Sequence, residues 1–226
     1  ALTFRAYAYE KLLHYYAPRW QDSNNGATKV LPLRIDESTG DPAPSTMSDT
    51  YAQIYKDCEE AITLFGSSSF TRSSSETWIP NVNVAHAVYA RAALTRQDYK
   101  TALSQATAAR KDFPLMSNAD YQSGFCKPTS EWIFGSYGDA TENNWYWSYG
   151  TQFSANGNFA SNTSYGTGQI SSALTNQIPD TDVRKHLFLT SDKIGWGDKT
   201  AVTLDYSDAN RDAYNKAINY IDSIHA

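Results

Sequence analysis

Residues 83–114 read NVAHAVYARAALTRQDYKTALSQATAARKDFP, and this stretch decides the fold. Apolar and small residues recur in it at helical spacing on either side of a short polar turn. A proline ends the stretch, and proline cannot continue a helix because it lacks the backbone N–H and clashes with the preceding turn. We therefore expect two helices, over residues 83–96 and 99–113, that form a hairpin.

The hairpin fits one tetratricopeptide unit, which is about 34 residues long. Tyr89 and Ala90 occupy the places of the Leu-Gly pair of such a unit, and Tyr99 lies at the turn. Small side chains let two helices cross closely, so that a large residue of one helix fills the groove of the other. In the second helix the small-residue positions hold Ala102, Ala106 and Ala109. The alternative is an ordinary helical hairpin, and either reading predicts a scaffold without specifying its function.

A second hairpin is predicted upstream, from helices over residues 1–16 and 48–65 separated by a polar loop at 17–46. In the second of these helices Asp49 lies in the first turn, where a negative charge favours the helix dipole, and Gly66 follows as the expected end. In the first helix the residues that share one face are Leu2, Ala6, Tyr9, Leu12, Leu13 and Tyr16.

Downstream of the hairpins the sequence loses its helical period. Residues 115–205 are rich in Gly, Asn, Ser, Thr and aromatic residues, with Glu131-Trp132-Ile133-Phe134 as a possible short strand or helix. A last helix is predicted at 208–224. The expected fold is mainly α, with tetratricopeptide-like hairpins packed against an irregular, loop-rich half. We expect one domain over 1–226, with a helical part at 1–114 and an irregular, ligand-binding part at 115–226.

The composition excludes several classes of protein. Aromatic residues make up 14% of the 226 residues, which argues against disorder. The formal net charge of −5 argues against a general nucleic-acid binder, because phosphate binding needs a basic face. Two cysteines are too few for a disulfide-rich scaffold, and no apolar run approaches the roughly 18 residues of a membrane span. Only 19% of the residues are charged, which suits a neutral partner.

No motif of a known catalytic or phosphate-binding class is present. We expect His14 and His86, on predicted helices, to be structural, and Cys58 and Cys126 to be buried, inert thiols, with a disulfide left open. The sequence thus predicts no enzyme, no cofactor and no metal site.

Two groups of acidic residues suggest chemistry only weakly. Asp180 and Asp182 could form a carboxylate pair for sugar hydrolysis, but we expect Asp182 to pair with Arg184 or another neighbour instead. The second group lacks the Gly and the terminal Glu of a calcium loop, so that helix capping is the favoured role. Its members are Asp205, Asp208, Asn210 and Asp212.

The run NNWYWSYG at 143–150 is the most informative stretch for function. Sugars present C–H faces that stack on flat rings, and hydroxyl groups that need amide or carboxylate partners. Trp145, Trp147 and Tyr149 alternate, so in an extended segment they would share one face, with Asn144 beside them. The alternative is that these rings pack the irregular half onto the helices. Lesser ligand candidates, for which a structural role is favoured, are Trp78, Trp20 and Trp196.

Several ordered segments resemble SusD-like (RagB/SusD) proteins. Their order and spacing carry the resemblance, which covers about residues 1–190. In chain order they are Arg5-Ala6-Tyr7-Ala8-Tyr9, Leu31-Pro32-Leu33, Ser48-Asp49-Thr50-Tyr51, Asp57-Cys58, Pro80-Asn81-Val82-Asn83-Val84-Ala85, Ala90-Arg91, Asp98-Tyr99, Glu131-Trp132-Ile133-Phe134 and Asp182-Val183-Arg184.

The resemblance implies a non-catalytic lipoprotein on the outer face of the outer membrane. Such proteins bind glycans and deliver them to a TonB-dependent SusC-like transporter, and they reach the membrane through an N-terminal lipid anchor. The lipoprotein cysteine and most of the C-terminal part of the family are not in this sequence, so we expect an excerpt of a longer chain. The alternative function is a helical-repeat scaffold that binds proteins and no sugar, and a glycoside hydrolase is a third hypothesis.

Overall fold

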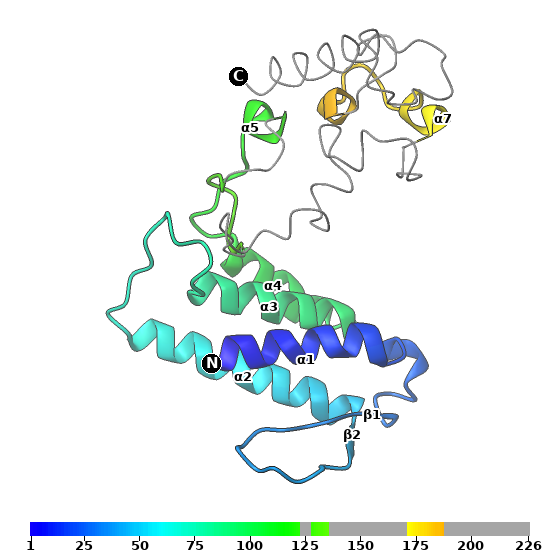
Figure 1. Cartoon of the computed structure of the whole chain (residues 1–226), viewed down its shortest axis with the longest axis vertical. Coiled ribbons are helices and arrows are strands. Elements are labelled where there is room, and N and C mark those ends of the chain that lie inside the picture. The colour runs from blue at the N-terminus through cyan, green and yellow to red at the C-terminus, as the bar shows by residue number, and fades with distance from the viewer. Residues whose placement is uncertain (123–127, 136–170, 188–226) are drawn as a thin grey trace, which may run out of the picture. The chain divides into compact units, whose positions relative to one another are not determined.

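The structure is a computed structural model that describes residues 1–122, 128–135 and 171–187 (Figure 1). The chain divides into two compact units. The first unit comprises Ala1–Leu115 and Ser130–Tyr137, and the second comprises Met116–Thr129 and Gly138–Ala226. The predicted helix at 208–224 and most of the predicted irregular half lie outside the described residues.

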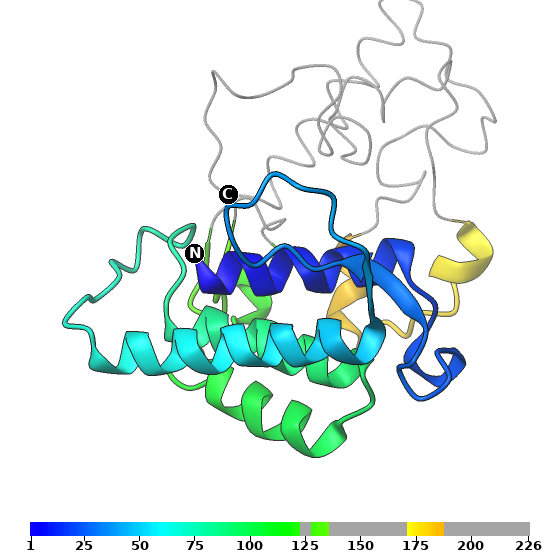
Figure 2. The same cartoon turned by 90° about the horizontal axis from the view of Figure 1, so that it is seen from below.

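The first unit is mainly helical and is built from packed helix pairs, as the sequence predicts. Figures 1 and 2 show α1 and α2 side by side, with α3 against them and α4 at the border of the helical layer. Its elements, in chain order, are α1 (Leu2–Tyr16), η1 (Trp20–Asp22), β1 (Lys29–Pro32), β2 (Pro44–Thr46), α2 (Met47–Ser67), α3 (Val82–Thr95) and α4 (Tyr99–Ala109).

Three of these helices start at a side chain that accepts a hydrogen bond from the backbone N–H three residues further on, at 3.1–3.2 Å. Such a cap satisfies one of the backbone donors that the first helical turn leaves without a partner. The capping residues of α2, α3 and α4 are Thr46, Asn81 and Asp98.

The structure differs from the expected helix boundaries at two places. Gly66 does not end α2, which continues to Ser67. The expected helix over 99–113 ends at Ala109 instead, and Asp112 then adopts a φ of +70°, which is incompatible with a continuing helix.

The segment at 17–46 is not only a polar loop. It contains η1 and an antiparallel pair of short strands, in which Leu31 lies opposite Ser45 and Pro32 opposite Pro44. Leu31 is buried in the main core, and Val30 and Leu33 pack against it, so that these apolar side chains hold the hairpin against the helices. The sequence pattern missed these strands because the many Pro and Gly residues of the segment conceal a strand of only four residues.

The core of the first unit lies where α1, α2 and α3 meet. Alanines of α3 such as Ala85 and Ala92 are completely buried, which lets α3 approach its neighbours closely. In α4, Ala102 and Ala109 are buried but Ala106 is exposed, so the expected small-residue contact at Ala106 is not made within the described residues. Large members of the core are Tyr9, Leu13, Met47, Tyr51, Ile54, Val88 and Tyr89.

In the second unit the described elements are α5 (Asn118–Gln122), α7 (Ser172–Thr175) and η3 (Val183–Leu187). The predicted pairing of Asp182 is confirmed, because Arg184 Nε donates to Asp182 Oδ1 at 3.0 Å. Lys185 pairs with Asp180 in the same way. The hydrogen bond from the Arg184 side chain lowers the pKa of Asp182 to about 2. A carboxyl group with so low a pKa is ionised at neutral pH and is unsuited to donate a proton as a general acid.

Candidate functional site

The candidate site comprises three partly exposed aromatic side chains of the first unit, Phe4, Trp78 and Phe134, which we call the aromatic cluster. The rings of Phe4 and Phe134 are in contact, and Trp78 lies on a segment that is hydrogen-bonded to the segment of Phe134. Phe4 is 46% exposed, and Trp78 and Phe134 are each 38% exposed. The rings of Phe4 and Phe134 meet edge to face, with their centroids 6.2 Å apart. Aromatic rings normally bury much of their surface. Partly exposed rings on three separate segments therefore provide a surface that suits the apolar face of a ligand.

Backbone hydrogen bonds bring the segments that carry Trp78 and Phe134 side by side. The N–H of Gly135 donates to the carbonyl of Thr77 at 3.2 Å. Arg72 Nη1 donates to the carbonyls of Ile79 at 3.1 Å and Ile133 at 2.8 Å. Burial lowers the pKa of the Arg72 guanidinium.

The residues at 130–135 form neither a strand nor a helix, contrary to the expectation for Glu131-Trp132-Ile133-Phe134. Their carbonyl and N–H groups bond to loop residues instead of to a regular ladder. Ile133 packs against the main core, which leaves its neighbour Phe134 facing outward. A Cβ on Gly135 would lie 3.1 Å from Trp132, so a side chain there would push the indole ring from its position.

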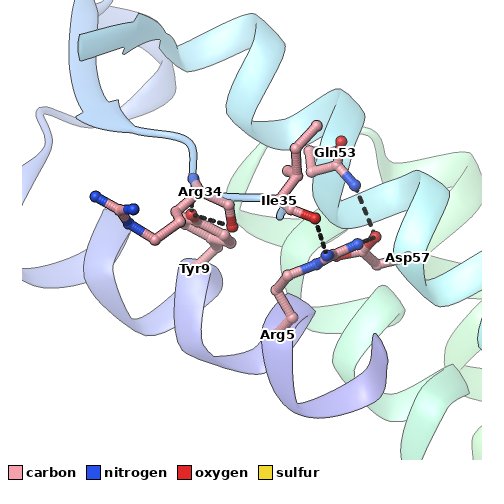
Figure 3. A network of polar contacts seen from close by, with 6 residues as sticks. All are labelled: Arg5, Tyr9, Arg34, Ile35, Gln53 and Asp57. Atoms are coloured by element: carbon pink, nitrogen blue, oxygen red, sulfur yellow. Dashed lines mark hydrogen bonds and ion pairs between the residues drawn. The ribbon is translucent and has the colours of Figure 1, made fainter. Parts of the chain in front are cut away.

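An ion pair with the buried Asp57 fixes α1, the helix that carries Phe4 (Figure 3). Arg5 donates two hydrogen bonds to the Asp57 carboxylate, from Nε at 2.7 Å and from Nη2 at 2.6 Å. Gln53 Nε2 donates to the same carboxylate at 2.7 Å, and Arg5 Nη1 donates to the carbonyl of Ile35 at 3.1 Å. Asp57 is fully buried, and its hydrogen bonds with Arg5 raise the pKa of that guanidinium. The network thus joins α1, α2 and the loop after β1.

A second contact of α1 secures the same loop. The backbone N–H of Arg34 donates to the Tyr9 hydroxyl at 2.5 Å, and that hydroxyl lies 3.2 Å from the carbonyl of Arg34 (Figure 3). The sequence pattern did not predict this network. One feature of the sequence could have indicated it: the acidic residue Asp57 lies on the same helix face as Ile54 and Cys58. A charged side chain on an apolar face requires a partner when it is buried.

Of the ligand-contacting residues predicted from the sequence, Trp78 is described and partly exposed. The other four lie outside the described residues, so the structure does not place them in the aromatic cluster. They are Asn144, Trp145, Trp147 and Tyr149.

The remaining tryptophan candidates differ from Trp78. Trp20 packs against the core, with its ring centroid 5.6 Å from that of Tyr51 and the Arg96 guanidinium 5.3 Å from its ring. This confirms the structural role favoured for Trp20. Trp196 lies outside the described residues.

The histidines and the first cysteine occupy structural positions, as predicted. His14 Nδ1 lies 3.1 Å from Glu10, whose buried carboxylate also lies 3.3 Å from Arg91, and His86 bonds to Gln105 at 2.6 Å. Cys58 is completely buried, and burial raises the pKa of its thiol to about 12, so it is unreactive at neutral pH. Cys126 and His225 lie outside the described residues.

In the part of the chain that the structure describes, none of the helices combines the length and the apolar character needed to span a lipid bilayer. The same part contains no group of three His, Cys, Asp or Glu side chains arranged to bind a metal ion.

Comparison with solved structures defines the class of fold, that of SusD-like proteins. A SusD-like carbohydrate binding protein from Bacteroides vulgatus ATCC 8482 matches 81% of the chain with a TM-score of 0.66 and 24% sequence identity. A SusD superfamily protein from Bacteroides thetaiotaomicron VPI-5482 matches 62% of the chain with a TM-score of 0.53 and 23% identity. The expected resemblance is thus confirmed as a likeness of fold over most of the chain.

This chain spans only part of the proteins it resembles. It covers 38% of the first solved structure and 31% of the second. No protein-family profile and no curated protein sequence matches it.

Proposed function

We propose that this chain is part of a SusD-like protein that binds an oligosaccharide or polysaccharide at the cell surface and catalyses no reaction on it. The observation that carries the proposal is the aromatic cluster, displayed on a scaffold with the fold of a SusD-like carbohydrate binding protein. The proposal needs both the exposed rings and the fold, because a fold by itself does not define a function.

The chemistry of the cluster suits the C–H face of a sugar ring. Phe4, Trp78 and Phe134 offer apolar area with few side-chain rotamers to lose on binding. The ion pair of Arg5 and the hydrogen bonds of Arg72 hold the supporting backbone in place before a ligand arrives, which reduces the entropic cost of binding. Trp145, Trp147, Tyr149 and Asn144 remain predicted contacts that would extend such a surface with rings and amide groups.

The proposal includes the cellular role that the resemblance implies. The whole protein would be a lipid-anchored protein on the outer face of the outer membrane and would deliver its glycan to a TonB-dependent SusC-like transporter. Co-purification of the full-length protein with such a transporter from solubilised outer membranes tests this part. Recovery of the protein in the soluble fraction, with no transporter bound, would contradict it.

The ligand claim is tested by native affinity electrophoresis of the intact chain through gels that contain a panel of neutral polysaccharides. We expect retardation by at least one of them. In that gel the variants Trp78→Ala and Trp145→Ala should each weaken binding about tenfold, which corresponds to a lost stacking contact of about 1.4 kcal/mol. The matched control is Tyr15→Ala, which removes a ring that is 78% exposed on α1 but outside the aromatic cluster.

Two results would overturn the ligand claim. One is the absence of retardation by every glycan of the panel, and the other is equal binding by the parent chain, Trp78→Ala and Trp145→Ala. The first result would favour the alternative function, a protein-interaction scaffold without sugar binding. Release of shortened sugars, abolished by Asp182→Asn, would instead revive the hydrolase hypothesis.

A further inference from the structure

The turn at residues 24–26 holds three consecutive residues in the left-handed region of backbone conformation. The φ values are +52° at Asn24, +54° at Asn25 and +83° at Gly26. The N–H of Ala27 donates to the carbonyl of Asn24 at 3.1 Å, so Asn25 and Gly26 are the two central residues of this turn. Asn and Gly adopt a positive φ more readily than other residues, which explains their presence here.

The same pair of residues is chemically reactive when the chain is unfolded. Glycine has no Cβ, so its backbone nitrogen can approach the side chain of a preceding asparagine without hindrance. The Gly26 nitrogen forms a bond to Cγ of Asn25, the bond from Cγ to Nδ2 breaks, and Nδ2 leaves as ammonia with the proton of the Gly26 nitrogen. Water then opens the resulting succinimide ring to aspartate or to isoaspartate, in which the main chain runs through Cγ.

The folded turn blocks this reaction at the attacking nitrogen. The N–H of Gly26 donates to Oγ of Ser23 at 2.9 Å, and that hydroxyl donates to the carbonyl of Trp20 at 2.5 Å. Ser23 is fully buried. In the succinimide, Cγ replaces the hydrogen of the Gly26 nitrogen, so it would have to lie between two atoms that are only 2.9 Å apart. Such a carbon would overlap the Ser23 hydroxyl, because heavy atoms that are not bonded to each other stay about 3–4 Å apart.

Close packing also keeps the turn from moving aside. A Cβ on Gly26 would lie 2.6 Å from the Trp20 ring and 3.0 Å from Cβ of Ser48, so this side of Gly26 has no free space. The Gly26 carbonyl accepts from the N–H of Ser48 at 2.9 Å, and the carbonyl of Thr28 accepts from the N–H of Met47 at 2.8 Å. These bonds satisfy two backbone donors of the first turn of α2. The turn therefore supports the start of α2.

We propose that Asn25 is a deamidation site that the fold protects, and that its conversion to isoaspartate weakens the attachment of the turn to α2. Isoaspartate inserts one carbon atom into the main chain directly before Gly26, which displaces the Gly26 carbonyl from its position opposite Ser48. The reaction proceeds only in chains in which the turn has opened, and each converted chain keeps a covalent record of that opening. This inference concerns the scaffold and does not depend on the proposed glycan binding.

The protection is measured by incubating the intact chain in mildly alkaline buffer, with and without denaturing urea, and following Asn25 by peptide mapping and mass spectrometry. Asn156–Gly157 is the other Asn–Gly bond of the sequence and serves as the internal standard in urea. We expect both bonds to react at similar rates in urea. In the folded chain Asn25 should react at least about tenfold more slowly than in urea, because the reaction must await opening of the turn.

A pair of serine variants locates the protection. Ser23→Ala removes the hydroxyl that occupies the path of Cγ, so it should speed up the reaction of Asn25 in the folded chain several-fold. Ser45→Ala on β2 is the matched control and should leave the rate unchanged. Circular dichroism confirms that each variant retains its helices. If Ser23→Ala does not fold, the comparison of the parent chain with and without urea still decides whether the fold protects Asn25.

The effect of the conversion is measured in the variant Asn156→Gln, whose one remaining Asn–Gly bond is at Asn25. This chain is converted in urea, refolded, and separated from unconverted chains by ion exchange. The isoaspartate form should unfold at a lower urea concentration than the variant Asn25→Asp, which has the same charge and an unaltered main chain.

Three outcomes would overturn the proposal. One is reaction of Asn25 at the same rate in the folded chain and in urea, and another is an equal rate in folded Ser23→Ala and Ser45→Ala. The third is equal stability of the isoaspartate form and of Asn25→Asp. Slow reaction in the folded parent chain, faster reaction in Ser23→Ala and earlier unfolding of the isoaspartate form would support the proposal.

Discussion

The two helical hairpins of the first unit both carry apolar residues at helical spacing, but they differ in which of these side chains are buried. In the α1–α2 hairpin large side chains such as Tyr9 and Ile54 fill the core, and Arg5 forms an ion pair with the buried Asp57. In α4 of the other hairpin the buried residues are alanines, and the large side chain of Leu103 is 72% exposed. Helical periodicity alone therefore does not distinguish a buried apolar stripe from an exposed one, since both hairpins carry apolar residues at helical spacing.

The largest expected effect comes from exchanging a core residue of one hairpin for alanine, and an exposed residue of the other hairpin is its control. Ile54→Ala should destabilise the fold by about 3 kcal/mol, because it removes a fully buried side chain and leaves a cavity. Leu103→Ala should change stability by less than about 0.5 kcal/mol. Urea denaturation followed by circular dichroism measures both. Equal losses would show that Leu103 is as buried as Ile54 and would remove the contrast between the hairpins.

The next effect concerns the Arg5–Asp57 ion pair of the α1–α2 hairpin. Arg5→Met should cost about 2 kcal/mol, because it leaves the Asp57 carboxylate buried without its cation, and the partial exposure of Arg5 moderates the loss. The matched control is Arg110→Met, at an exposed position after α4, which should be nearly neutral. Thermal unfolding compares the two, and a neutral Arg5→Met would mean that Gln53 or water satisfies Asp57 equally well.

A smaller effect is expected at the start of α4. Asp98→Ala should cost about 1 kcal/mol, because it removes the side chain that accepts from the N–H of Thr101. Asn81→Ala should cost a similar amount at the start of α3, through the same kind of cap. Urea denaturation at pH 7 measures both, and a cost near zero for either would show that its helix needs no cap.

The two caps should differ in their dependence on pH. Hydrogen bonding with Thr101 lowers the pKa of Asp98 from its ordinary value of 3.8. A lowered folded-state pKa means that the stabilisation is complete above the ordinary value and is lost as the pH falls below it, through the lowered pKa. The cost of Asp98→Ala should therefore shrink below about pH 4, while the cost of Asn81→Ala stays constant. Parallel pH profiles for the two variants would contradict this assignment.

The sequence predicted the helices of the first unit because their signals are local. The apolar spacing, the Asp49 first turn and the closing proline of 83–114 each act within a few residues. The strands β1 and β2 were not predicted from the sequence. So short a strand is defined by its pairing partner and by the burial of Leu31, and neither is a local property of the sequence.

The candidate site could be predicted only in part, for a similar reason. Trp78 could be chosen as a ligand candidate from its residue type alone. The position of its segment beside that of Phe134 depends on the bonds that Arg72 and Thr77 make to residues 130–135, more than 50 positions away along the chain. No spacing rule reports such contacts. The same holds for the Arg5–Asp57 pair, whose members are 52 residues apart.

The most direct test of glycan binding by the aromatic cluster is titration calorimetry with the polysaccharide that best retards the intact chain. The proteins compared are the parent chain, Trp78→Ala and the control Tyr15→Ala. We expect Trp78→Ala to weaken binding about tenfold and Tyr15→Ala to leave it unchanged. Unchanged glycan binding by a folded Trp78→Ala variant would contradict the proposed site.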